Sequence, residues 1–150
     1  MSQIQDAIKM TGRLNIVLTD EHGNVKEEHE VDNLVVTAGK GFIASRIKDA
    51  TAAVMSHMAV GTSSTAPAVG DTTLGAEIAS SRTALTSTTV TTNSVAYVCT
   101  FGTGVGTGAV TEAGIFNAAA AGTMLCRTTF SVINKGASDT LTITWTVTVN

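Results

Sequence analysis

The sequence predicts a mainly β protein: an antiparallel, jelly-roll-like β-sandwich of about eight strands with one α-helix near residues 38–49. Three observations predict it. Apolar and polar residues alternate in successive stretches, glycine-rich or polar turns separate these stretches at regular spacing, and only one substantial stretch has helical spacing. A parallel α/β sheet would instead need a helix between most pairs of strands.

The clearest strand is formed by the last ten residues, 141–150. One parity carries apolar side chains and the other carries threonines, which is typical of a strand with one buried face. The apolar residues are Leu141, Ile143, Trp145, Val147 and Val149. An exposed edge of this length would aggregate, so we expect the strand to be paired or covered inside the sandwich.

The other strands are expected as hairpins and short runs. Leu14, Ile16 and Leu18 alternate, and residues 25–31 form their partner after the polar bend 20–24. Asn93 and Ser94 supply a turn that joins an extended stretch at 80–92 to the alternating residues 95–101. Further strands are expected at 55–60, 109–116 and 124–130, with a short apolar run at 34–36, loops at 61–70 and 102–108 and a turn at 117–122.

One substantial helix is expected, at 38–49, with Thr37 as its N-cap and an apolar stripe of Phe42, Ile43 and Ile47. Gly39 and Gly41 weaken it intrinsically, so its stability has to come from packing, with its backbone close against a sheet. A further helical turn is expected over 71–78, capped by Asp71.

The chain is long enough for one domain, which we place at residues 13–150, preceded by a flexible N-terminal arm at 1–12. A net charge of −3 and the lack of a basic cluster exclude nucleic acid as an expected partner. No apolar run suits a membrane helix and no signal peptide is recognisable, so we expect a protein that folds in a cytoplasm and has no membrane partner.

Charge is distributed unevenly: residues 1–50 contain 14 charged side chains and residues 51–150 contain 7. A surface with so few charges is typical of proteins whose outer faces meet other protein. We therefore expect a homo-oligomer or a subunit of a larger assembly. Glu112 and Arg127 are among the rare later charges, and each is expected to be paired or interfacial.

No stretch predicts a catalytic, cofactor-binding or metal site, so the protein is not expected to be an enzyme or to hold a cofactor. The glycine loop 102–108 lacks the lysine of a phosphate loop and the helix of a dinucleotide site. The acidic and histidine-containing segment 20–32 has no metal-binding spacing and is interpreted as a solvated hairpin tip. His57 is isolated, and no serine lies in a nucleophile elbow. Cys99 and Cys126 are expected to be two reduced core thiols.

Five stretches together resemble a group of small virion proteins of tailed bacteriophages. They are NLVVTAGK at 33–40, MAVGTSSTAPAVGDTTLG at 58–75, GAVTEAGIFN at 108–117, GTMLCRTTF at 122–130 and KGASDTLTITWTVTV at 135–149. The resemblance implies a non-enzymatic structural component of the virion, located on the capsid surface or in the tail and present in the host cytoplasm during assembly. The charged N-terminal third departs most from the pattern.

The first functional hypothesis is a capsid decoration or cement protein, an oligomer that binds the major capsid protein or neighbouring virion proteins. The alternative is a tail or fibre subunit that touches the host surface, and the number of copies per particle separates the two. A carbohydrate-binding β-sandwich is a third hypothesis, which requires exposed aromatic platforms.

Overall fold

The computed structural model describes residues 6–150, which contain ten strands and one α-helix. In chain order these are β1 (Met10–Thr19), β2 (Val25–Asp32), β3 (Leu34–Val35), α1 (Thr37–Lys48), β4 (His57–Gly61), β5 (Thr83–Ala84), β6 (Ser87–Thr91), β7 (Ser94–Phe101), β8 (Gly108–Phe116), β9 (Met124–Lys135) and β10 (Thr140–Val149).

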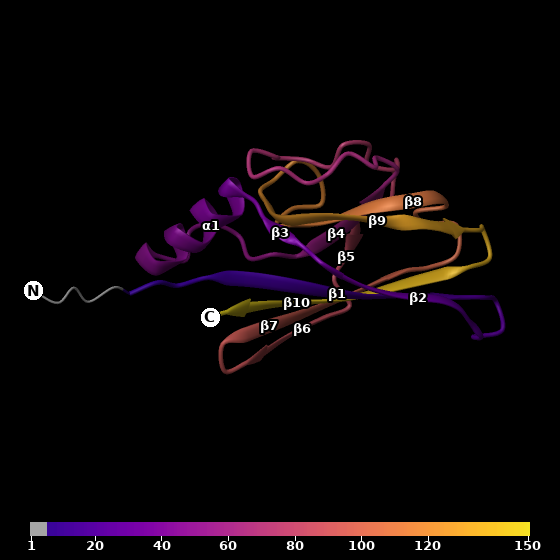
Figure 1. Cartoon of the computed structure of the whole chain (residues 1–150), viewed down its shortest axis with the longest axis horizontal. Coiled ribbons are helices and arrows are strands. Elements are labelled where there is room, and N and C mark those ends of the chain that lie inside the picture. The colour runs from indigo at the N-terminus through magenta and orange to yellow at the C-terminus, as the bar shows by residue number, and fades with distance from the viewer. Residues whose placement is uncertain (1–5) are drawn as a thin grey trace, which may run out of the picture.

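The strands form two antiparallel sheets of five strands each, packed face to face (Figure 1). Sheet A has the order β2-β1-β10-β7-β6, and sheet B has the order β3-β9-β8-β4-β5. The predicted antiparallel β-sandwich with one helix is confirmed. The first and last strands lie side by side, so the C-terminal strand completes the middle of sheet A.

β10 is the central strand of sheet A and pairs with β1 on one side and β7 on the other. Its alternation is obeyed along most of its length, because Leu141, Ile143, Trp145 and Val147 are buried while the threonines between them are half-buried. Val149 is 39% exposed and departs from the expected stripe, since it is the last residue of the strand.

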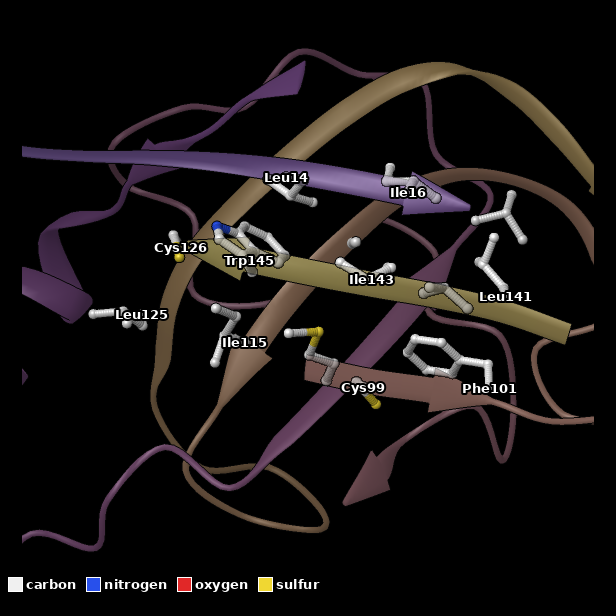
Figure 2. Packing of buried hydrophobic residues seen from close by; sticks show 14 of the residues in the cluster. Leu14, Ile16, Cys99, Phe101, Ile115, Leu125, Cys126, Leu141, Ile143 and Trp145 are labelled. Atoms are coloured by element: carbon white, nitrogen blue, oxygen red, sulfur yellow. The ribbon is translucent and has the colours of Figure 1, made fainter. Parts of the chain in front are cut away.

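The main core lies between the two sheets. Trp145 pairs with Leu14 of β1, and Ile143 pairs with Cys99 of β7, so these side chains meet in the same layer. Figure 2 shows the row formed along β10, with β1 side chains on one side and β7 side chains on the other; the labelled members are Leu14, Ile16, Cys99, Phe101, Leu141, Ile143 and Trp145. Ile115 and Leu125 come from sheet B. One core therefore serves both sheets.

β1 begins earlier than the expected domain boundary at residue 13. Met10, Thr11 and Gly12 belong to the strand and pair with the last residues of β10. Lys9 also exchanges two backbone hydrogen bonds with Asn150, with N···O distances of 3.1 and 2.7 Å. The sandwich thus begins at Lys9, and residues 1–5 of the predicted arm lie outside the described residues.

Helix α1 begins one residue earlier than expected, and Thr37 is not its N-cap. Val36 occupies the capping position without a side-chain bond, and the Thr37 N–H donates to the backbone oxygen of Val69 at 2.8 Å. The first free N–H group of the helix is therefore satisfied by the backbone of a distant loop, and not by the Thr37 side chain as expected. The helix has 12 residues, too few to cross a membrane, and no other helix occurs in residues 6–150.

The backbone of α1 lies against sheet B at Gly39, as predicted. Gly39 is the one buried residue of the helix, and a Cβ atom there would come within 2.1 Å of the Leu125 backbone oxygen. Phe42 and Ile43 pack against the main core, but Ile47 is 87% exposed. The apolar stripe therefore ends early, because the last part of the helix extends beyond the sheets (Figure 1).

A long loop, residues 62–82, covers the outer face of sheet B, and it is the magenta to pink trace above β8 and β9 in Figure 1. Beneath it lies a second, smaller core made of Val36, Ala59, Leu74, Phe116 and Met124. The helical turn predicted over 71–78 is absent. The sandwich consequently has one covered outer face, on sheet B, and one open outer face, on sheet A.

Candidate functional site

The loop over sheet B is fixed by a buried carboxylate. Glu112 lies on β8 with 0% exposure. Its Oε2 accepts hydrogen bonds from the backbone N–H of Ala76 at 2.7 Å and of Ser63 at 3.1 Å, and its Oε1 accepts one from Gly75 at 2.8 Å. The backbone N–H groups of Gly75 and Ala76 therefore cannot also form the hydrogen bonds of a helical turn over 71–78. This explains why that predicted turn does not form.

Arg127 completes this network from the adjacent strand β9. Its Nε and Nη2 lie 3.1 and 3.0 Å from Oε1 of Glu112. Its Nη1 donates to Oδ2 of Asp71 at 3.0 Å, and Nη2 donates to the backbone oxygen of Thr65 at 3.0 Å. Glu112 and Arg127 were each expected to be paired or interfacial, and the structure shows that they pair with each other. Every donor nitrogen of the guanidinium is used, so the network holds the loop in place.

A second arginine fixes the end of the same loop. The Arg82 guanidinium lies 3.6 Å from the centre of the Phe116 ring and pairs with Glu77 at 2.8 Å. It also donates to the backbone oxygens of Ala118 and Ala121 at 2.9 and 3.1 Å. The turn after β8 and the loop that crosses sheet B are therefore joined through one side chain.

All seven charged side chains of residues 51–150 make a hydrogen bond or an ion pair within the chain. Besides the two networks above, Lys135 donates to the Gly102 backbone oxygen at 2.8 Å, and Asp139 pairs with Lys26 at 3.0 Å. Sequence reasoning found Glu112 and Arg127 but missed Asp71 and Arg82. Their rarity in this part of the chain was the only signal that could have found them.

The polar residues at the first hairpin have a structural role at its bend. Oδ1 of Asp20 accepts hydrogen bonds from the backbone N–H groups of His22 and Asn24, both at 2.9 Å. These bonds, with the Asn24 contact the largest, hold the pKa of Asp20 below its usual value. No group of three or more potential metal ligands occurs within residues 6–150.

His57 and the glycine loop are likewise accounted for by local structure. Nδ1 of His57 lies 2.8 Å from the Ser56 hydroxyl. The loop 102–108 turns through Gly104, Gly106 and Gly108, which all have positive φ. Its Gly104 N–H donates to the Ala137 backbone oxygen at 2.9 Å, which closes the end of the sandwich.

Cys99 and Cys126 are free thiols and both are buried. Burial raises the pKa of Cys99 to about 12 and raises that of Cys126 well above its ordinary value. Neither sulfur is a thiolate near neutral pH, so the two residues serve as core side chains.

The outer face of sheet A is the candidate interaction surface, and we call it the threonine face. Neighbouring strands present small, mostly uncharged side chains in rows across this face, as the pairing of Asn15 with Thr144 and of Thr144 with Val98 illustrates. The members on the three central strands are Thr11, Arg13, Asn15, Val17 and Thr19 of β1, Thr140, Thr142, Thr144, Thr146 and Thr148 of β10, and Ser94, Ala96, Val98 and Thr100 of β7.

Charges on the threonine face gather at one border. Arg13 of β1 pairs with Glu30 at 2.7 Å and with Asp32 at 3.4 Å, both on β2. The neighbouring depression has a volume of about 480 Å³, and its lining includes Arg13, Glu30, Thr144 and Thr146. The rest of the face, over β10, β7 and β6, carries no charged side chain. No other described segment covers it.

No protein-family model, curated protein or solved structure matches this chain. The interpretation of the threonine face therefore depends on its own chemistry. It offers hydroxyl groups and methyl groups in a regular array, with acidic side chains at one border. Such an array can bury area against another protein surface at a small desolvation cost.

Proposed function

We propose that the chain is a structural protein of a phage virion, and that it decorates and stabilises the assembled capsid. The observation that carries the proposal is the threonine face, an uncovered and largely uncharged outer surface formed by a whole sheet. The resemblance of residues 33–149 to small virion proteins of tailed bacteriophages supports the same assignment. The partners would be the major capsid protein or neighbouring virion proteins.

The proposed mechanism is binding without chemistry. The interior charges of the later chain are occupied by the bonds that fix the loop over sheet B, so they stabilise the subunit. The threonine face then adds contact area to each shell subunit that it touches. Many copies on one symmetric shell multiply modest contacts into a large total stabilisation.

The test is to purify phage particles from cells that produce this chain and to count it by quantitative mass spectrometry. We expect it to sediment with the particles in a density gradient, in numbers comparable to the major capsid protein. If the chain stays in the soluble fraction, the proposal is wrong. If only a few copies sediment with each particle, the tail or fibre alternative replaces capsid decoration.

A pair of variants tests the threonine face itself. Thr144→Glu places a charge at the centre of the face and is expected to release the chain from particles. Thr72→Glu, in the exposed part of the loop over sheet B, adds the same charge elsewhere and is the matched control. Equal retention of both variants would show that another surface makes the contact.

The carbohydrate-binding hypothesis is not favoured by the aromatic side chains. All six are buried or half-buried, and Trp145, Phe101 and Phe116 are at most 1% exposed. Sugar rings stack on exposed aromatic faces. Selective binding on a glycan array would nevertheless revive that hypothesis.

A further inference from the structure

Each sheet ends in two edge strands, and three of the four edges are protected against pairing with another chain. In sheet B the edges β3 and β5 have two residues each. In sheet A the edge β2 carries Lys26 and a run of acidic residues, Glu27, Glu28, Glu30 and Asp32. Short length and charge are the usual devices that keep an edge from pairing.

The fourth edge, β6, has neither device. Its sequence is Ser-Thr-Thr-Val-Thr, all five residues are exposed, and it pairs only with β7. It contains no charge and no proline, and the only bulges recorded in the described sheets lie elsewhere, in the pairs β1–β2 and β8–β9. β6 therefore presents a row of backbone donors and acceptors with no strand beside it.

Exposed apolar area accompanies this open edge. Val90 is 71% exposed, and it pairs with Val95 of β7, which is half-buried. A strand placed beside β6 would cover Val90 and extend the sheet at the same time.

We propose that β6 is a self-pairing edge, at which a second copy of this chain adds its own β6 in antiparallel orientation across a two-fold axis. The occupant follows from charge: across a two-fold axis residue i of one copy meets residue j of the other, and j meets i, so a strand whose charges are mostly of one sign repels its own copy, while an uncharged strand does not. The β2 edge fails this condition and β6 meets it.

The pairing joins two five-stranded sheets into one continuous sheet. The two-fold axis between antiparallel strands is perpendicular to the sheet, so both copies present their threonine faces on the same side. The assembly stops at two copies, because the remaining edge of each sheet A is the charged β2 strand. This inference does not rest on the proposed virion role.

The experiment compares the oligomeric states of three proteins by analytical ultracentrifugation. The unaltered chain is expected to sediment with twice its 15.3 kDa mass. Thr89→Lys puts a charge in the middle of β6 and is expected to weaken the dimer at least about tenfold, because like charges then face each other across the axis. Thr144→Lys, on the central strand of the same face, is the control and is expected to leave the dimer intact.

Hydrogen exchange identifies the surface involved. Backbone amides of residues 87–91 are expected to exchange slowly in the dimer and faster in Thr89→Lys, while melting temperatures show that both variants fold. A monomeric unaltered chain, a trimer or larger ring, or a dimer that Thr144→Lys breaks and Thr89→Lys does not, would each overturn the proposal. None of these outcomes bears on whether the chain sediments with particles.

Discussion

A single carboxylate oxygen of Glu112 accepts a hydrogen bond from Nε of Arg127 at 3.1 Å and lies 3.0 Å from Nη2 in the same ion pair, while both residues are almost completely buried. The second carboxylate oxygen is reserved for backbone amides of the loop. This pair therefore joins the β8–β9 hairpin to a segment that lies 36 to 49 residues away in the sequence. Removing one member leaves the other charge buried without its partner.

Glu112→Gln is expected to lower the free energy of unfolding by about 3–5 kcal/mol, the usual cost of breaking a buried ion pair. Urea denaturation followed by the fluorescence of Trp145, the single tryptophan, measures the change. Glu30→Gln is the control, because its pair with Arg13 is exposed and is worth about 1 kcal/mol or less. Equal effects of the two substitutions would contradict a special role for the buried pair.

Two glycines of α1 are expected to respond in opposite directions to alanine. Gly39→Ala would place its Cβ within 2.1 Å of the Leu125 backbone oxygen, so we expect a loss of about 1–3 kcal/mol. Nothing lies within 4 Å of a Cβ at Gly41, and Gly41→Ala is expected to gain about 0.5–1 kcal/mol of helix stability. Thermal denaturation of both variants checks this, and the same sign for both would show that α1 does not pack through Gly39.

The Cys99 thiol is expected to make stability fall at alkaline pH. Its pKa is about 12 in the folded protein and about 9.0 as the reference value, so the unfolded chain loses the proton first. The contribution of the protonated Cys99 thiol to the free energy of unfolding is fully present below about pH 9, and it is lost as the pH rises toward 12. Comparing the unfolding free energies of the unaltered chain and Cys99→Ala at about pH 8 and about pH 10 isolates this thiol. A difference that does not change with pH would contradict the prediction.

Neither thiol is expected to react with an alkylating reagent while the protein is folded, since both are buried and protonated. Mass spectrometry after treatment in native buffer should show no adduct, and treatment in denaturant should show two. Rapid native labelling of either cysteine would mean that the core opens readily.

N-terminal truncation is expected to lower the melting temperature only when the deletion extends beyond residue 8, and to have done so by residue 12. Deleting residues 1–12 removes Met10, Thr11 and Gly12 from β1 and leaves the end of β10 without a partner. Deleting residues 1–8 keeps Lys9 and its two bonds to Asn150. The longer deletion is therefore expected to have the lower melting temperature, and equal melting temperatures would place the start of the sandwich later.

Strands and hairpins could be predicted because their signals are local. The alternation along β10 follows from neighbouring residues, and the polar residues around Asn93 mark the β6–β7 hairpin. The turn itself lies one residue earlier than expected, at Thr92 and Asn93, because Ser94 pairs with Thr91 as the first residue of β7. The close approach of Gly39 to sheet B also followed from local reasoning, since a glycine-weakened helix has to be stabilised by packing.

The errors occur where a distant partner overrides a local preference. Thr37 was expected to be the N-cap, but it is the first residue of the helix, and its backbone N–H donates a hydrogen bond to the Val69 oxygen of a distant loop. The turn at 71–78 does not form because the amides of Gly75 and Ala76 bond to Glu112. Asp71 was expected to cap that turn, and instead it pairs with Arg127, 56 positions later. Sequence periodicity contains no information about such contacts.

The loop fastened over sheet B makes the two outer faces of the sandwich chemically unlike. One side presents irregular chain held down by a buried carboxylate, and the other presents paired strands with rows of hydroxyl and methyl groups. A partner that recognises regularly spaced side chains therefore meets them on one side of the subunit.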